Sequence, residues 1–111
     1  MDYERELLKG NTDCLLLCLI NRQPTYGYQI IKELERQSNG YFRFKEGTLY
    51  PALHRMEKDG IIKGIWQMLA SGQQRRYYYI TKRGQQVLAK RLADWQDFLA
   101  AVRLVTQPET I

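Results

Sequence analysis

Residues 41–60 have the sequence YFRFKEGTLYPALHRMEKDG, whose second half has two contrasting faces if it is helical. One face is apolar and follows the i, i+3, i+4, i+7 spacing of an amphipathic helix: Leu49, Ala52, Leu53 and Met56. The other face begins with short side chains and becomes basic: Gly47, Thr48, Pro51, His54, Arg55 and Lys58. Short side chains let a backbone approach a DNA major groove, and longer ones reach base edges and phosphates. We therefore interpret this stretch as a recognition helix.

Pro51 limits where this helix can begin. A proline is tolerated within the first three helical positions, whose N–H groups have no intrahelical partner. We therefore expect Thr48 as the N-cap, because an earlier start at Glu46 would force a small kink at the proline. The helix is expected to end before Gly60, which suits the left-handed position after a helix.

The length and composition indicate one small globular domain. The chain has 111 residues, of which 44% are hydrophobic and 26% charged, with three prolines. No run approaches the roughly 20 apolar residues that span a bilayer, and the charged start, MDYERELLKG, does not look like a signal peptide. We expect a cytoplasmic protein without membrane contact.

The cysteines and the single histidine do not suggest a metal site or an active site. Cys14 and Cys18 lie four residues apart on one expected helix, where a disulfide is geometrically poor, so we expect both to be reduced and buried. A metal would need more ligands, and His54 lies far along the chain. With no acid–base constellation and no glycine-rich phosphate loop, the sequence indicates neither an enzyme nor a cofactor.

The positive charge is concentrated around the expected recognition helix. Residues 41–84 hold nine Lys or Arg and three Asp or Glu, whereas the whole chain has a net charge of +5. Localised positive charge is typical of a surface that binds a polyanion.

Two helices are expected before residue 41. Residues 1–10 predict a short helix or arm with Leu7 and Leu8 as its large apolar pair, and residues 14–19 predict a central helix capped by Asn11 or Thr12 and ended by Pro24. In the second helix Tyr26, Ile30 and Leu34 repeat every four residues, Thr25 is the N-cap candidate, and residues 39–40, Asn-Gly, suit a left-handed C-cap. Gly27 indicates close approach of another group, either the recognition helix or a phosphate. Tyr26 and Tyr28 are candidates for phosphate contact, and structural aromatics are the alternative.

A β-hairpin is expected next. Residues 61–69 (IIKGIWQML) and 75–81 (RRYYYIT) have strand composition, and residues 70–74 (ASGQQ) form the turn. This arrangement places Arg75 and Arg76 near the tip. On the second strand Tyr78 and Ile80 are expected to face inward, whereas either face of the first strand could do so.

The last helix, capped by Thr81, carries a coiled-coil seam with 4-3-4-3 spacing, flanked by Val87 and Phe98. A small domain has little left to cover it, so self-association is expected; folding back onto the chain's own core is the alternative. The predicted dimer interface comprises Leu7, Leu8, Leu88, Leu92, Trp95, Phe98, Leu99 and Val102.

Three helices followed by a basic hairpin predict a winged helix-turn-helix, a mostly α fold with a small β-hairpin (α+β). Residues 1–84 are expected to form the DNA-binding domain with its N-terminal arm. Residues 85–111 are expected to form a C-terminal dimerisation helix in the same compact unit.

The sequence resembles the PadR family of bacterial transcriptional regulators over nearly its whole length. The matching stretches are LKG (8–10), YGY (26–28), GTLYPAL (47–53), EKDGII (57–62), RYYYIT (76–81) and Gly84. The resemblance, closest to the smaller subfamily with one C-terminal helix, implies a homodimer that binds an inverted-repeat operator and usually represses. Family members control varied targets, including drug efflux, phenolic-acid detoxification, virulence and circadian-clock genes. In some members of the small subfamily a flat aromatic compound stacks between paired tryptophans, which makes Trp95 a candidate site for a small aromatic effector; seam packing is the alternative.

The predicted partner is double-stranded DNA. Thr48, Tyr50, His54 and Arg55 are expected to contact bases or adjacent phosphates, while the lysines and the two hairpin arginines mainly neutralise phosphates. The full predicted DNA-binding set is Tyr26, Tyr28, Lys45, Thr48, Tyr50, Pro51, His54, Arg55, Lys58, Arg75 and Arg76. The alternative is a winged-helix module that contacts protein or senses a ligand without binding DNA.

Overall fold

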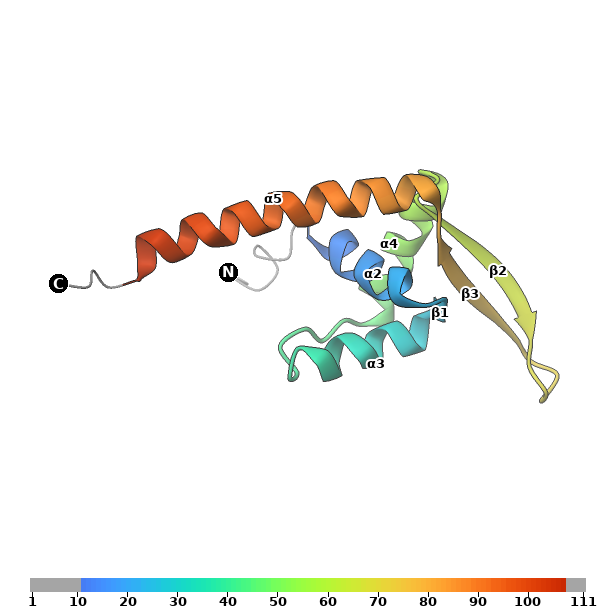
Figure 1. Ribbon diagram of the computed structural model, residues 1–111. Coiled ribbons are helices and arrows are strands. Elements are labelled where there is room, and N and C mark those ends of the chain that lie inside the picture. Colours follow the sequence, from blue (N-terminus) through green and yellow to red (C-terminus); the bar gives the residue numbers. More distant parts are fainter. Residues whose placement is uncertain (1–10, 108–111) are drawn as a thin grey trace.

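The structure, a computed structural model, describes residues 11–107. Helix α2 lies between α5 and α3, and a long hairpin projects from the end of the molecule opposite to that from which α5 extends (Figure 1). The elements are α2 (Thr12–Arg22), β1 (Thr25–Tyr26), α3 (Gly27–Gln37), α4 (Glu46–Lys58), β2 (Ile62–Met68), β3 (Gln74–Ile80) and α5 (Lys82–Thr106).

The core forms where α2 meets α3, α4 and the base of the hairpin. The fully buried side chains come from all these elements: Leu16, Leu17, Ile20, Ile30, Leu49, Leu53, Met56 and Ile62. The predicted central position of the first core helix and the apolar face of the recognition helix are therefore confirmed. Residues 1–10, including Leu7 and Leu8, and residues 108–111 lie outside the described residues.

Residue Thr25 begins a strand rather than capping a helix, so that prediction was wrong. Thr25 is buried and pairs with Tyr78, next to the pairing of Tyr26 with Tyr77, and the sheet has the antiparallel order β1-β3-β2. Tyr26 then occupies the N-cap position of α3. Because its pairing partner lies 53 residues later in the chain, local sequence gave no indication of this strand.

Helix α4 begins at Glu46, three residues earlier than a Thr48 cap would place it, which corrects the predicted start. Its N-cap is Lys45, whose carbonyl accepts the N–H groups of Thr48 and Leu49 at 3.0 Å each. Pro51 thus lies within the helix, where it cannot donate to the carbonyl of Gly47. The complete burial of Leu49 in the extended first turn offers a physical reason for tolerating this loss.

The predicted helix ends are confirmed. Gly60 has a φ of +75°, and its N–H and that of Ile61 bond to the carbonyls of Glu57 (3.1 Å) and Met56 (3.0 Å), which is the Schellman arrangement. Asn39 and Gly40 take left-handed φ values after α3 in the same way.

The hairpin is confirmed, and its burial is confined to its base. Tyr78 is buried and Ile80 packs against the core, as predicted. Ile62, the first residue of β2, is buried, and so is Ile61 just before it, so burial at the base favours neither of the two faces. Farther out, the exposed fractions of Trp66 and Met68 are 59% and 71%, because the hairpin extends away from the helices (Figure 1).

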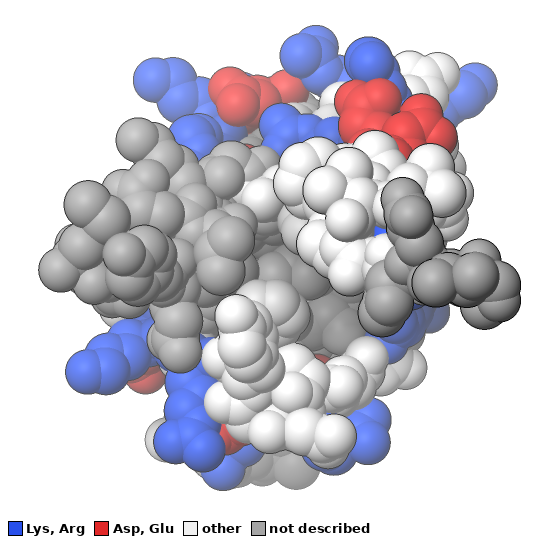
Figure 2. Space-filling view, turned by 90° about the vertical axis from the view of Figure 1, so that its left-hand side faces the viewer, with Lys and Arg blue, Asp and Glu red and all other residues white. Residues whose placement is uncertain are grey.

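Helix α5 is capped by Thr81, whose Oγ1 accepts the N–H of Gly84 at 3.0 Å. Leu88, predicted as part of the dimer interface, is 4% exposed within its own chain and belongs to the core, so little of its surface is left for a partner. The later seam residues stay uncovered, with exposed fractions of 37% for Leu92, 40% for Leu99 and 37% for Val102. Figure 2 shows the end from which α5 projects, where groups of uncharged side chains face the viewer and Lys and Arg lie mostly around the edge.

The two cysteines are free thiols in different surroundings. Cys14 is buried, as predicted, whereas Cys18 is only partly buried, which corrects that part of the prediction. Burial, with a smaller contribution from Cys18, raises the pKa of the Cys14 thiol to about 11. Within residues 11–107, no helix combines the length and apolarity needed to cross a membrane.

Candidate nucleic-acid interface

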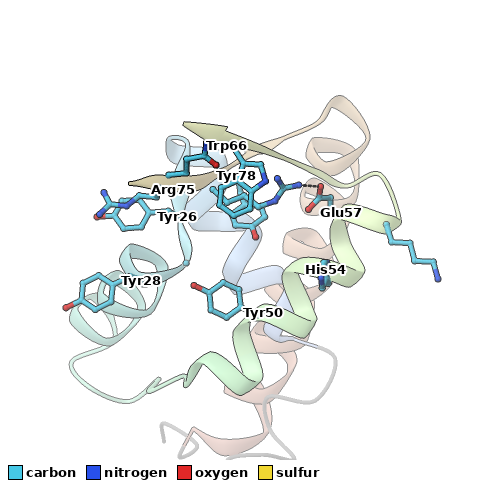
Figure 3. A pocket seen from close by; sticks show the side chains of 12 residues that line it. Tyr26, Tyr28, Tyr50, His54, Glu57, Trp66, Arg75 and Tyr78 are labelled. Carbon is cyan, nitrogen blue, oxygen red and sulfur yellow. Dashed lines mark hydrogen bonds and ion pairs between the residues drawn. The ribbon is translucent and has the colours of Figure 1, made fainter. Parts of the chain in front are cut away.

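A groove of about 970 Å³ lies between α4, the start of α3 and the hairpin. Figure 3 shows Tyr50, His54 and Glu57 along α4, with Trp66 and Tyr78 of the hairpin across from them. The lining residues are Tyr26, Gly27, Tyr28, Tyr50, His54, Glu57, Lys58, Trp66, Gln74, Arg75, Arg76 and Tyr78. Elements that are distant in sequence therefore contribute to one concave surface.

The α4 wall presents the side chains of Tyr50, His54 and Lys58 to the groove. His54 and Lys58 are exposed, and Tyr50 is 43% exposed. A Cβ on Gly27 would lie 2.5 Å from the Tyr50 hydroxyl oxygen, so glycine is needed for the Tyr50 ring to pass over the start of α3. The recognition helix is thus the neighbour of Gly27, as one of the two alternatives predicted, and the contact is made by the Tyr50 side chain.

On the hairpin wall, Arg75 stacks on an aromatic pair. Its guanidinium carbon lies 3.9 Å from the centre of the Tyr26 ring, and the edge of that ring contacts Tyr77 at a centroid distance of 5.3 Å. This cation–π contact leaves the Arg75 N–H groups able to donate to an anion.

Arg76, the next residue, is held differently. Its Nη2 lies 2.5 Å from Oε2 of Glu57, and its guanidinium carbon lies 5.3 Å from the centre of the Trp66 ring. The two hairpin arginines were predicted to act as an equivalent pair, but they have different environments. Burial raises the pKa of the adjacent Tyr78 hydroxyl, so this tyrosine remains neutral and able to donate.

Several predicted DNA-binding residues lie outside this groove. Arg55 donates to Asp13 of α2 at 2.9 Å, on another flank of α4. Lys45, Thr48 and Pro51 are exposed on or just before α4 without lining the groove. The other predicted residues do line it: Tyr26, Tyr28, Tyr50, His54, Lys58, Arg75 and Arg76.

Sequence reasoning missed several groove residues. Trp66 and Gln74 join it through the strand register, in which Trp66 pairs with Arg76 and Gln74 with Met68. Lys32, whose Nζ lies 5.3 Å from the centre of the Tyr28 ring, places another cation beside the groove. The i, i+4 spacing of Tyr28 and Lys32 could have revealed this pair.

Residues 16–90 match the model of the Transcriptional regulator PadR-like family. The chain belongs to this family. A PadR-like transcriptional regulator from Bacillus cereus has a similar structure, with a TM-score of 0.82 and 31% identity over 94% of this chain and 99% of that one. A transcriptional regulator from Clostridium thermocellum gives a TM-score of 0.83 and 27% identity over 92% and 99% of the two chains. The sequence is also 40% identical to Transcriptional regulator Rv3488 of Mycobacterium tuberculosis over 65 residues, 59% of this chain and 57% of that protein.

The PadR-like assignment confirms the predicted family and winged-helix fold. PadR-like regulators bind DNA, typically as dimers, and are not enzymes. In this PadR-like chain, α4 and the hairpin are therefore the candidate elements for contact with DNA.

Proposed function

We propose that this PadR-like protein is a repressor that binds an inverted-repeat operator as a homodimer. The observation that supports this most directly is the shared groove: α4 and the hairpin form its two walls, and both walls carry polar and basic side chains. With α4 in a major groove, a strand of the DNA backbone would pass between α4 and the hairpin, which would contact the flanking minor groove. Such a protein acts in the cytoplasm, where it shares a compartment with the chromosome.

The exposed residues of α4 have distinct proposed roles. Thr48, Tyr50 and His54 would contact bases or adjacent phosphates, and Pro51 would approach the groove with them. The side chain of Arg55 is 57% exposed although it pairs with Asp13, which suits a contact at the edge of the site. The phosphate contacts are assigned to Lys45, Lys58 and Arg75, assisted by the hydroxyl groups of Tyr26 and Tyr28.

The dimer is proposed to form along the outer part of α5. Leu92, Leu99 and Val102 follow the seam spacing, and Phe98 beside them is 63% exposed. Two copies joined by this face would present two α4 helices to successive major grooves, with half-site centres about 34 Å apart.

A small aromatic effector is proposed to bind near Trp95. The ring is partly buried and meets Phe98 edge-on at a centroid distance of 6.2 Å, so a flat compound at the dimer face could contact both. If Trp95→Ala leaves both dimerisation and the response to planar aromatic compounds unchanged, the site lies elsewhere or does not exist.

Binding to DNA fragments from the protein's own promoter region, measured by fluorescence anisotropy with excess competitor DNA, tests the main proposal. The double variant Thr48→Ala, His54→Ala should lose the preference for the promoter fragment, each lost base contact costing about 1–3 kcal/mol. Arg36→Ala is the control, because this exposed cation pairs with Glu33 outside the groove. If the wild-type protein binds no promoter fragment even at low ionic strength, the alternative of a winged-helix module for protein or ligand contact is favoured.

A further inference from the structure

Glu57 is an acidic residue in a groove that is proposed to hold DNA. It lies on α4 between His54 and Lys58, and 29% of its side chain is exposed. A carboxylate close to a phosphate strand repels it, so a direct contact with the DNA backbone would be unfavourable. Glu57 pairs instead with Arg76 of β3: Oε2 lies 2.5 Å from the arginine Nη2, and a dashed line marks this ion pair in Figure 3.

The rest of the protein provides a defined place for the Arg76 guanidinium. Gly64 of β2 pairs with Tyr78 of β3. A Cβ at Gly64 would lie 2.5 Å from Nε and 2.7 Å from Cζ of Arg76. The guanidinium thus lies over a glycine, beside Trp66, with its charge directed at Glu57. The Arg76 side chain is 27% exposed, and its guanidinium already pairs with a carboxylate of α4.

We propose that Arg76 is a positioning residue: with Glu57 it holds the hairpin at a fixed distance from α4, and it does not neutralise phosphate. This inference rests on the proposed DNA-binding function and assigns different roles to the two adjacent arginines. Arg75, stacked on Tyr26, is the phosphate ligand. Arg76, paired across the groove wall, sets the spacing between the two DNA-contacting elements.

Salt dependence separates the two roles, because each phosphate contact adds about one unit to the slope of log K against log salt. Arg75→Ala should lower the magnitude of this slope by about one. Arg76→Gln should weaken binding at least about fivefold, as expected for a partly buried group that loses its charged partner, and leave the slope unchanged. A slope reduction of about one in Arg76→Gln would overturn the proposal.

The variant Glu57→Gln separates the two roles most clearly, because they predict opposite changes in DNA affinity. If Arg76 were a phosphate ligand, removing the acid would free it, and binding would become tighter and more salt-dependent. Positioning predicts the reverse: weaker binding although a negative charge has been removed from the DNA surface. The double variant Glu57→Gln, Arg76→Gln should bind no more weakly than either single variant, because one interaction is lost in all three. Tighter binding by Glu57→Gln, or additive losses in the double variant, would overturn the proposal.

Gly64→Ala tests the same contact without changing any charge. The added methyl group displaces the guanidinium, so DNA binding should weaken with an unchanged salt slope, and unchanged affinity would contradict the proposal. Glu33→Gln is the control for Glu57→Gln, because it makes the same substitution in an ion pair outside the groove. This variant should bind DNA like the wild type.

A measurement on the free protein separates this inference from the proposed function. In a Trp95→Phe background Trp66 is the remaining tryptophan, and its emission should change alike in Gly64→Ala and Arg76→Gln without DNA. Identical emission in all three proteins would overturn the contact itself. Failure of the wild-type protein to bind any promoter fragment, with the emission change present, would reject DNA binding and leave the contact standing.

Discussion

The indole Nε1 of Trp95 donates a hydrogen bond to Oδ1 of Asn11 at 2.9 Å, joining α5 to the start of α2. Asn11 is the N-cap residue of α2, but its side chain makes no capping hydrogen bond. Oδ1 of Asn11, which could cap α2, thus binds the indole of α5 instead. This contact marks the boundary along α5 between the part that packs on the core and the part that extends beyond it.

Removing this hydrogen bond should destabilise the protein modestly. Asn11→Ala leaves the partly buried indole N–H without its partner, and we expect a loss of about 1 kcal/mol in the free energy of unfolding. Urea titration at constant protein concentration measures it. Trp95→Phe removes the same bond, and the double variant should lose little more than the larger single loss. Full additivity would show that the two residues act separately.

The exposed seam of α5 should be required for dimer formation. Leu99→Glu places a charge in the centre of the proposed interface, so sedimentation should show a monomer and binding to the inverted repeat should fall sharply. Ala101→Glu adds the same side chain to an exposed position on the opposite side of the helix and serves as the control. A dimer that survives Leu99→Glu would place the interface elsewhere.

Gly27→Ala should separate DNA binding from stability. The new methyl group would lie 2.5 Å from the Tyr50 hydroxyl oxygen, so the Tyr50 ring must move from its place in the groove. Gly27 is the first residue of α3 and its φ is not positive, so alanine fits its backbone conformation. The free energy of unfolding should therefore change by less than about 1 kcal/mol, while the affinity for the operator falls. Urea titration and anisotropy measured on the same preparation check both parts. Wild-type affinity would mean that the position of Tyr50 does not matter for binding.

Gly84→Ala should be strongly destabilising. A Cβ at this position would lie 2.1 Å from the backbone carbonyl oxygen of Ile61, which cannot move away as a side chain can. We expect a loss of at least about 2 kcal/mol in the free energy of unfolding. Gly47→Ala is the matched control: nothing lies within 4 Å of its Cβ position in α4, and stability should rise by about 0.5 kcal/mol. Equal effects at the two sites would contradict the close packing at Gly84.

The Cys14 thiol should make stability fall in alkaline solution. Its pKa is raised from 9.0 to about 11 by burial, so the unfolded chain releases this proton at a lower pH than the folded protein does. The stabilisation is fully present below pH 9 and is lost as the pH rises toward 11. Cys14→Ala should be less stable throughout, from the lost packing, but its stability should depend less on pH in this range. Urea titrations at several pH values measure the difference, and parallel curves would contradict the expectation.

The sequence predicted the elements that depend on neighbouring residues. The apolar spacing from Leu49 to Met56 indicated α4, the composition of residues 61–81 indicated the hairpin, and Gly60 and Thr81 indicated a helix end and a helix start. The start of α4 was placed too late, because local rules weigh Pro51 heavily and cannot include the burial of Leu49 against other helices.

Charge pattern alone likewise indicated a basic surface and its helix, and so the kind of partner. It could not show that Arg55 pairs with Asp13, that Arg76 pairs with Glu57, or that Thr25 forms a strand beside Tyr78. These partners lie 42, 19 and 53 residues apart. Residue type and spacing along the chain determined which helices and strands form, because their hydrogen bonds and faces are local. Only the tertiary structure decided which charges remain available to DNA, because ion pairs and strand pairing depend on which distant segments packing brings together.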